Sequence, residues 1–527
     1  MYSDYDLDKP IEAKVGLRQG LTSYGDAHFS LFLRKVFIKA LGYSEESIEK
    51  PIIGIVNTFS GFNPCHANVP QLIEAVKRGV HLDGGLAVEF PTISIHESFS
   101  SPTSMYLRNL MSMDTEEMIR PQPCDAVVLI GGCDKTTVTQ LMGGLSANKP
   151  ILHLVTGPMM TGKFKGVRIG ACTDCRNNWA KFRAGEIDIE DISAINEELA
   201  PAGGTCGVMG TASTMACVLV GLGLMPFAGA SPAAVSSARL RVAEKTGSNA
   251  VKSCQQSEPL RPQTLLTRES FLNAITVLQA IGGSTNVVVH LMAIIGQHPS
   301  VSGTITLETF NEIGAQTPLL VDLKPSGSNY MADFHDSGLT LGQKLAKAAP
   351  MSLPQELSCI QSFDKPLYRK SSLVVLKGNL AREALHDPIP RKLSTKGVSD
   401  MIRISDGRMS GTAGGTIVLH VSPEAANLSS VLGIVQSGDT ISLDVEARIL
   451  NVDITDEEIL RRQETRKEAM TKEQALGCKK RLLEAIEVST FVQSLKLSMA
   501  LILIFFGLHT LDLLVTIFEH ERVDSVI

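Results

Sequence analysis

Aromatic residues and basic charge are both scarce in this sequence of 527 residues. It contains one Trp and seven Tyr, and its 55 Asp and Glu outnumber its 49 Lys and Arg, which gives a formal net charge of −6. Nucleic-acid binding depends on clustered positive charge and on aromatic side chains that stack on bases. The composition therefore argues against a nucleic acid as the partner.

Cysteines are few for this length, ten in all, and they are scattered along the chain. A disulfide scaffold packs many cysteines into a short secreted chain. Residues 1–16 lack the apolar segment of a secretory signal and carry too many acids for a clear mitochondrial transit peptide. These absences predict a cytoplasmic protein, with a mitochondrial location left open, whose thiols are free to hold metal.

Long apolar runs are also missing, apart from one near the C-terminus. Residues 497–518 are long enough to cross a bilayer core of about 30 Å. They include His509 and Asp512, and a central Asp costs about 2.5–3.5 kcal/mol on insertion. We therefore favour a buried or partner-seeking helix over membrane contact, and treat residues 471–527 as an atypical helical, hydrophobic tail.

Apolar segments alternate with helical patterns in the first two thirds of the chain. Short apolar runs at 52–60, 125–134 and 150–159 predict buried strands, and the intervening segments 69–85 and 103–113 have helical periodicity. This alternation predicts an α/β fold with a parallel sheet. We expect an N-terminal α/β domain over residues 1–350, with apolar helices at 210–225 and 269–296 packed inside it.

The pattern changes from about residue 368. Segments rich in β-branched residues and separated by Gly and Asp turns lie at 371–381, 400–406, 415–426 and 431–454. They predict a smaller, β-barrel-like C-terminal domain over residues 368–470, and a charged helix begins within it at 456.

Three cysteines stand at turns among small or polar residues: Cys65, Cys133 and Cys206. Iron–sulfur clusters are held by thiolates, and backbone N–H groups near the sulfurs tune them. Three ligands would leave one iron open to a substrate oxygen, which suits a Lewis-acid catalyst. Because free buried cysteines are common, spacing alone is weak support for a cluster.

The other cysteines allow simpler interpretations. Cys172 and Cys175 form the chain's one CxxC pair, which suggests zinc or redox chemistry, although zinc sites of this kind need a second pair. Cys124 and Cys217 lie among apolar residues, and we expect them to be core packing.

Acidic residues lie close to the cysteines in the sequence. Asp134 and Lys135 follow Cys133 directly, and Glu97 lies in the segment SIHESFSSPTS. Carboxylate oxygens suit Mg²⁺, which keeps several waters and exchanges some for substrate oxygens. Taken alone, these residues fit a surface Asp–Lys pair and a loop Glu equally well.

A loop rich in Gly, Ser and Thr spans residues 404–416. Its glycines would let the backbone approach a ligand, and Arg408, Ser410 and Thr412 could contact an acid. The loop lacks the Lys and the spacing of a P-loop, so a nucleotide is not supported as its ligand.

Taken together, several long motifs resemble the dihydroxy-acid dehydratase / 6-phosphogluconate dehydratase family. They are NPCHAN, GGCDKTT, TCGVMGTAST, GGSTN, KPSG, KGNLA, PIPRKL and RISDGRMSGTAGGT, in the family's order over about residues 15–465. The segment around Glu97 and the ACTDCRNNWAKFRAGEI segment resemble the sugar-acid (aldonate) branch. That branch includes arabinonate and xylonate dehydratases.

The resemblance assigns roles to particular residues. It implies that Cys65, Cys133 and Cys206 hold the cluster, 2Fe–2S rather than 4Fe–4S, and that the CxxC pair does not. It also implies that Glu97, Asp134 and a carbamylated Lys135 bind Mg²⁺. Two further implied roles lie in the C-terminal loop, where Ser410 is the base and Thr412 lies near the substrate.

The implied activity is that of a hydro-lyase that converts a polyhydroxy acid to a 2-keto-3-deoxy acid, in a homodimer or a dimer of dimers. A dihydroxy-acid dehydratase of branched-chain amino acid biosynthesis is the first alternative. The second is an inactive truncated paralogue or splice form. Three departures from the family suggest it. An acidic family segment that carries a further magnesium-ligand Glu is missing between Ala381 and Pro388, and the chain is also shortened at 334–345. The C-terminus departs from the family after about Glu468.

Overall fold

The chain is represented by a computed structural model. It describes residues 11, 15–21, 26–100, 104–171, 173–256, 258–337, 359–387, 402–408 and 417–469.

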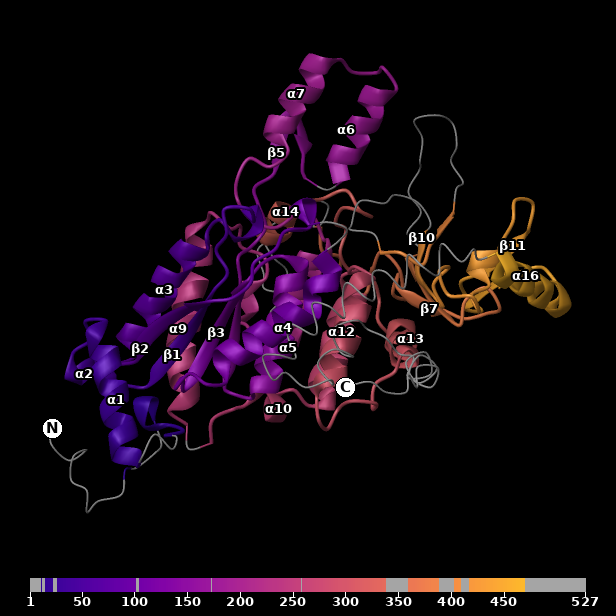
Figure 1. Cartoon of the computed structure of the whole chain (residues 1–527). Coiled ribbons are helices and arrows are strands. Elements are labelled where there is room, and N and C mark those ends of the chain that lie inside the picture. The colour runs from indigo at the N-terminus through magenta and orange to yellow at the C-terminus, as the bar shows by residue number, and fades with distance from the viewer. Residues whose placement is uncertain are drawn as a thin grey trace, which may run out of the picture.

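A parallel sheet of four strands forms the centre of the N-terminal part (Figure 1). Its strands are β1 (Ile52–Asn57), β2 (Leu86–Pro91), β3 (Ala126–Gly131) and β4 (Ile151–Val155), in the order β2-β1-β3-β4. All three strand pairs are parallel. The predicted α/β class and the three predicted strands are confirmed.

Helices cover both faces of this sheet because its strands are apolar on both faces. Ile53 and Ile55 pack with α3 (Val69–Leu82) and α9 (Ser237–Cys254), whereas the alternate residues Ile52 and Val56 belong to a larger cluster on the other face. The helices of that second cluster are α5 (Asp134–Ala147), α8 (Thr211–Gly221), α11 (Arg268–Ala280) and α12 (Asn286–Gln297).

The contact between α3 and α9 is unusually close because glycines lie at the crossing. A Cβ atom added to Gly79 would lie 1.9 Å from the carbonyl oxygen of Glu244, and one added to Gly247 would lie 2.2 Å from that of Val76. Only glycine fits at both positions, so the sequence fixes how closely these helices approach.

The remaining described helices surround this core. They are α1 (Ala27–Ala40), α2 (Glu45–Ile48), α4 (Arg108–Ile119), α6 (Thr173–Arg183), α7 (Ile189–Glu198), α10 (Pro262–Leu265), α13 (Leu307–Gln316), α14 (Met331–Asp336) and α16 (Asp456–Ala469). The helices α6 and α7, with the hairpin β5 (Gly162–Phe164) and β6 (Val167–Ile169), project from the rest of the chain (Figure 1).

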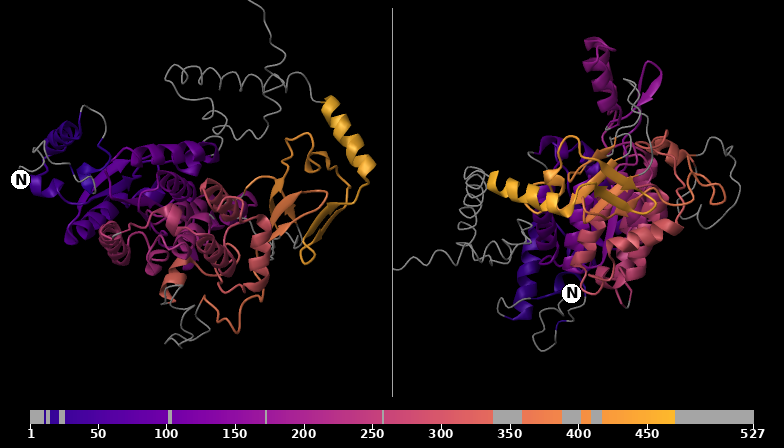
Figure 2. Two further views of the ribbon diagram at one scale, coloured as in Figure 1. Left: turned by 90° about the horizontal axis from the view of Figure 1, so that it is seen from below. Right: turned by 90° about the vertical axis from the view of Figure 1, so that its right-hand side faces the viewer.

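The C-terminal part contains a second sheet, at the end of the molecule opposite the N-terminus (Figure 2). Its strands are β7 (Val374–Leu376), β8 (Glu383–Asp387), β10 (Ile417–Ser422) and β9 (Arg403–Ile404), in the order β7-β8-β10-β9. A hairpin of β11 (Ile441–Asp444) and β12 (Ile449–Val452) joins it through a bridge between Lys377 and Ile449. These strands form no closed barrel within the described ranges, so the barrel-like expectation is not confirmed.

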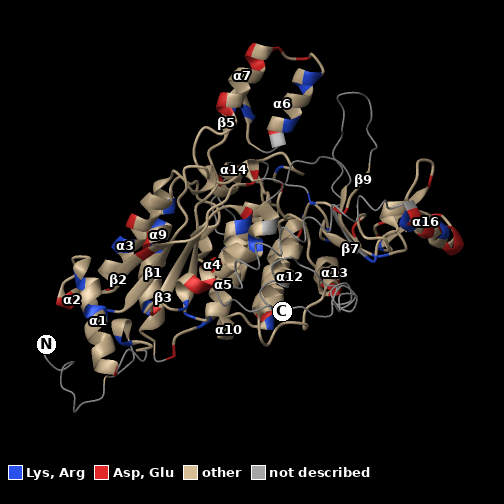
Figure 3. Cartoon of the chain, in the orientation of Figure 1, with Lys and Arg blue, Asp and Glu red and all other residues tan. Residues whose placement is uncertain are grey.

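The predicted charged helix is present as α16, and Figure 3 marks acidic residues in red and basic residues in blue along its ribbon. Arg462 anchors it to the preceding loop through Asp439, with Nη1 2.6 Å from a carboxylate oxygen. No helix in the described part of the chain is both long and apolar enough to cross a membrane. Residues 497–518 lie outside that part, so their interpretation stays a prediction.

Candidate active site

The candidate site lies where three parallel strands end. Thr58 follows β1, Gly132 and Cys133 follow β3, and Thr156 follows β4. In open α/β sheets, ligands bind beyond the carboxyl ends of the strands. A Cβ atom on Gly132 would lie 1.7 Å from Oγ1 of Thr156 and 3.0 Å from the carbonyl oxygen of Cys65. Glycine at position 132 therefore allows these loops to meet.

His66 links the Cys65 turn to the Cys133 loop. Its Nε2 accepts hydrogen bonds from the backbone N–H groups of Gly132, at 3.0 Å, and Cys133, at 3.2 Å. Because Nε2 accepts, the ring proton lies on Nδ1, which donates to the carbonyl oxygen of Thr58 at 2.9 Å. Burial lowers the pKa of His66 to about 4. His66 is therefore a neutral residue that positions both cysteine loops.

Cys65 and Cys133 form a buried thiol pair joined by a hydrogen bond. The hydrogen bond from Cys133, together with His96, outweighs burial and lowers the pKa of Cys65 to about 6. The same hydrogen bond, together with burial, raises the pKa of Cys133. The pair therefore holds one negative charge near neutral pH, as residues that present thiolate to a metal must.

The loop that carries Cys206 lies against the Cys65 turn. The backbone N–H of Gly204 donates to the carbonyl oxygen of Pro64 at 2.9 Å, and a Cβ atom on Gly203 would lie 2.7 Å from that of Ala67. The Cys206 sulfur is disulfide-bonded in this structure. A cluster needs it as a thiolate, so its role as a ligand stays a prediction.

Glu97, Asp134 and Lys135 come together, as the family resemblance implies. Lys135 lies at the start of α5 and is 1% exposed, and its Nζ is 2.6 Å from Glu97 and 3.0 Å from Asp134. Glu97 and Asp134 form an acid pair. The Cys133 sulfur is 3.4 Å from the Asp134 carboxylate, so the acid pair lies next to the thiol pair of Cys65 and Cys133. One turn thus presents a thiol and a carboxylate side by side.

Arg408 reaches this acid pair from the C-terminal part. Its guanidinium lies 3.0 Å from Glu97 and 3.1 Å from Asp134. Burial alone would raise the pKa of Asp134, but the charges of Lys135 and Arg408 outweigh it and hold that pKa below its usual value. Asp134 therefore stays ionised within the protein, and the Glu97 and Asp134 carboxylates each contact both cations.

The donor chemistry of this site fits the two groups that the sequence suggested. Two buried thiols that share one negative charge suit iron, and two adjacent carboxylates suit a hard divalent cation. Within the described ranges, no three His, Cys, Asp or Glu side chains gather as a metal-binding group. A third oxygen ligand for Mg²⁺ would come from Lys135 only if that lysine were carbamylated.

Several predicted residues lie outside this arrangement. Ser410, Thr412 and Cys172 fall outside the described residues, and Cys175 lies on α6. Cys124 and Cys217 are buried, and burial raises their pKa values to about 11 and about 12, which confirms that they are core packing.

Sequence reasoning missed four polar residues around the site: His66, His96, Arg108 and His290. His66 lies next to Cys65 in the NPCHAN motif and His96 lies next to Glu97, which were the available signals. Arg108 is 11 residues from Glu97 in the sequence, and His290 lies in a segment, 269–296, that was recognised only as an apolar helix.

Comparison with known proteins matches most of the chain to one family. The model of the dihydroxy-acid/6-phosphogluconate dehydratase N-terminal domain matches residues 50–348, and that of the C-terminal domain matches residues 382–488. The second match extends past Glu468, so the expectation that the family resemblance ends there is wrong. The boundary predicted near 470 between a C-terminal domain and a separate tail stays a prediction.

The similar proteins are named as dehydratases of several different acids. The chain is 37% identical to L-arabonate dehydratase of Azospirillum brasilense, over 82% of this chain and 87% of the relative. It is 35% identical to 6-deoxy-6-sulfo-D-gluconate dehydratase of Pseudomonas putida, over 80% and 86%. It is 30% identical to dihydroxy-acid dehydratase of Moorella thermoacetica, over 81% and 91%. The chain belongs to the dihydroxy-acid/6-phosphogluconate dehydratase family, whose members are hydro-lyases.

Proposed function

We propose that this chain dehydrates a sugar acid, an aldonate, to the 2-keto-3-deoxy acid, with an iron–sulfur cluster of the 2Fe–2S type and Mg²⁺. The observation that carries the proposal is the contact between the buried Cys65–Cys133 thiol pair and the acid pair of Glu97 and Asp134. A dehydratase needs to stabilise negative charge on the acid and to assist the departure of hydroxide. These adjacent sites suit the two tasks.

Different residues of the chain would bind the cluster and Mg²⁺. Cys65, Cys133 and Cys206 would hold the cluster, and Glu97, Asp134 and a carbamylated Lys135 would hold Mg²⁺. When bound, these groups would supply Lewis acids for the substrate oxygens. His66 holds the Cys65 turn and the Cys133 loop together through its hydrogen bonds. Arg408 is close enough to the acid pair to orient an anionic substrate.

The reaction itself requires a base on the C-terminal loop. We assign that role to Ser410, which would remove the C2 proton, with Thr412 beside it. The C3 hydroxyl then leaves as water, and the resulting enol takes up a proton at C3 to become the ketone. A free serine is a poor base, so this role requires nearby positive charge. Arg408, two residues away in sequence, supplies one such charge.

Two considerations favour a sugar acid over a branched-chain dihydroxy acid. The sugar-acid dehydratases described above are 35–37% identical to the chain, whereas the dihydroxy-acid dehydratase is 30% identical. Position 97 carries Glu, as in the sugar-acid branch that the surrounding segment resembles. The dihydroxy-acid activity is the alternative outcome of the test below.

A non-catalytic form is the second candidate, and the alignments supply an observation for it. The alignment with the arabonate dehydratase is 515 positions long, but it includes only 82% of the 527 residues of this chain. The other aligned positions are gaps in this chain. Relatives therefore contain internal segments that this chain lacks. A chain of this kind could hold the cluster without turning over substrate.

The test is a substrate panel with the full chain, purified anaerobically and assayed with Mg²⁺. We expect 2-keto-3-deoxy acid from at least one pentonate or hexonate, with a kcat/KM above that for 2,3-dihydroxyisovalerate. The opposite ranking would favour the dihydroxy-acid alternative. A protein that contains iron and sulfide yet converts none of these acids would favour the non-catalytic form.

A further inference from the structure

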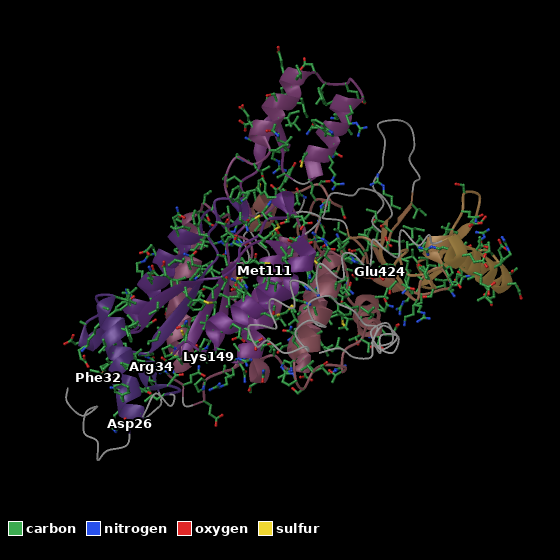
Figure 4. All side chains as sticks on the ribbon, viewed as in Figure 1. Asp26, Phe32, Arg34, Met111, Lys149 and Glu424 are labelled. Carbon is green, nitrogen blue, oxygen red and sulfur yellow. The ribbon has the colours of Figure 1, made fainter. Side chains whose placement is uncertain are left out.

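Arg108 is a half-buried cation, and two buried nitrogen atoms of its guanidinium lack hydrogen-bond partners in the described structure. It is the first residue of α4, and its Nε and Nη1 atoms are buried without a hydrogen-bond partner in the described structure. Figure 4 labels Met111 on the same helix, which lies in the middle of the molecule. An N–H donor left unpaired in the interior is destabilising, and more so when it carries charge.

His290 presents the same feature from another helix. It lies on α12 and is 1% exposed, and neither of its ring nitrogens has a hydrogen-bond partner in the described structure. It lies within electrostatic reach of Asp134, Lys135, Arg108 and Arg408. His290 therefore lies near both Arg108 and Asp134, one member of the acid pair.

The helices explain how these residues meet. Both α4 and α12 pack against α5, whose first two residues are Asp134 and Lys135 (Figure 1). Arg108 belongs to the first turn of α4 and His290 to the second turn of α12. The start of each helix thus contributes a polar group to one region, which also receives Arg408 from the C-terminal part.

The geometry of the unpaired atoms indicates what they bind. Nε and Nη1 of Arg108 are positively charged N–H donors, and the oxygens of a carboxylate, phosphate or sulfonate group are the acceptors that satisfy such donors best. His290 adds a further ring N–H donor from its neutral form. An apolar or cationic occupant would leave all these donors unpaired.

We propose that Arg108 and His290 form an oxyanion subsite of the active site, which binds an anionic group of the sugar acid. This inference rests on the proposed function. The anionic group is either the C1 carboxylate or a distal phosphate or sulfonate, and the two sources share the same recognition chemistry.

The test compares binding to the full chain and to the variant Arg108→Gln by isothermal titration calorimetry. The ligands are D-gluconate, 6-phospho-D-gluconate and the uncharged hexitol. We expect Arg108→Gln to weaken binding of at least one acid by about tenfold or more, and to leave the hexitol unchanged. Arg120→Gln is the matched control, because Arg120 caps the other end of α4 and is exposed.

The pattern of losses identifies the bound group. Equal losses for gluconate and phosphogluconate would assign the subsite to the carboxylate, whereas a loss confined to phosphogluconate would assign it to the distal group. Unchanged binding of both acids to Arg108→Gln would overturn the proposal. So would a wild-type chain that binds neither acid.

Thermal unfolding separates a binding role from a structural one. Because the two guanidinium atoms are unpaired, Arg108→Gln should unfold at a temperature no lower than Arg120→Gln, in the absence of ligand. A much lower unfolding temperature would show that Arg108 stabilises the fold, and would overturn the proposal. Arg108→Lys, which keeps the charge but replaces the guanidinium donors with a single ammonium group, should recover part of the lost affinity.

Binding and turnover can fail independently. If Arg108→Gln weakens acid binding but the wild-type chain converts no acid, the subsite stands and the proposed reaction fails. If the wild-type chain converts an aldonate and Arg108→Gln binds it normally, the subsite fails and the reaction stands. His290→Asn should reproduce a smaller loss of affinity for the same acid as Arg108→Gln, and no loss would remove His290 from the subsite.

Discussion

At the residue scale, the three predicted cluster cysteines allow the most direct test of the proposed cofactor. Replacing Cys65, Cys133 or Cys206 with Ser should abolish the visible absorbance of the cluster and lower the iron content of anaerobically purified protein. Cys217→Ser is the control, because Cys217 is fully buried on α8 away from the loops that carry the ligands. Retention of the absorbance after any one of the three replacements would remove that cysteine from the ligand set.

His66 provides a pH-dependent test of the loop geometry. Its pKa is about 4 in the folded protein, against about 6.5 in an unfolded chain, so the unfolded state binds more protons between these values. Stability from neutral His66 is therefore complete above pH 6.5 and is lost as the pH falls towards 4. The expected loss between pH 7 and pH 5 is about 2 kcal/mol.

The measurement is chemical denaturation of the wild-type chain and His66→Gln at both pH values. Buried His153 and His290 have pKa values lowered in the same direction, so only the difference between the two proteins reports on His66. The variant should lose less stability on acidification. Parallel losses would contradict a buried neutral His66.

The sequence allowed part of the site to be predicted residue by residue. The turn positions of Cys65 and Cys133, and the neighbouring Asp134, predicted what the structure brings together. The partners of His66 and the surroundings of His290 could not be predicted, because they depend on contacts across sequence separations that no local pattern encodes.

At the scale of elements, the close contact between α3 and α9 leads to a prediction about the free energy of unfolding. Gly247→Ala would place a methyl group where the backbone of α3 lies, 2.2 Å from the Val76 carbonyl oxygen. Overpacking of this kind costs about 1–3 kcal/mol, and denaturant unfolding should show it. Gly296→Ala on α12 is the matched control, since its added methyl group meets nothing within 4 Å.

That control should leave the free energy of unfolding unchanged or raise it by up to about 1 kcal/mol, because Ala has the higher helix propensity. Equal effects of the two replacements would contradict the close helix contact. The same contact explains why α9 was not predicted from the sequence. Its segment contains Gly247 and Thr246, which are poor helix formers, and packing against α3 compensates for them.

Other elements were predicted because their patterns are local. The apolar runs at β1, β3 and β4 and the amphipathic pattern of α3 required no tertiary information. The apolar segment 269–296 divides into α11 and α12 at a turn where Gly282 has a φ of +60°. Glycine tolerates this conformation without strain, so the helix ends there.

At the scale of the whole molecule, the acidic family segment that is missing between Ala381 and Pro388 leads to a prediction about turnover. The residues that remain between Ala381 and Pro388 include β8, a central strand paired with β7 and β10. Inserting a family-typical acidic segment between Asp387 and Pro388 would restore a ligand Glu and leave this strand intact. Turnover of an aldonate at saturating Mg²⁺ should rise by at least about tenfold.

A glycine- and serine-rich insert of equal length at the same position is the control for added length. It should give no increase, because it supplies no carboxylate. If the unmodified chain already turns over as fast as the restored chain, the shortening has no catalytic consequence.

The most direct test of the account is the reaction of an aldonate with the full chain in D₂O, followed by mass spectrometry of the product. Removal of the C2 proton, loss of the C3 hydroxyl and uptake of a solvent deuteron predict a 2-keto acid that has lost one water and carries deuterium at C3. Recovery of the aldonate unchanged, or of a product that keeps all its oxygens, would contradict a sugar-acid dehydratase.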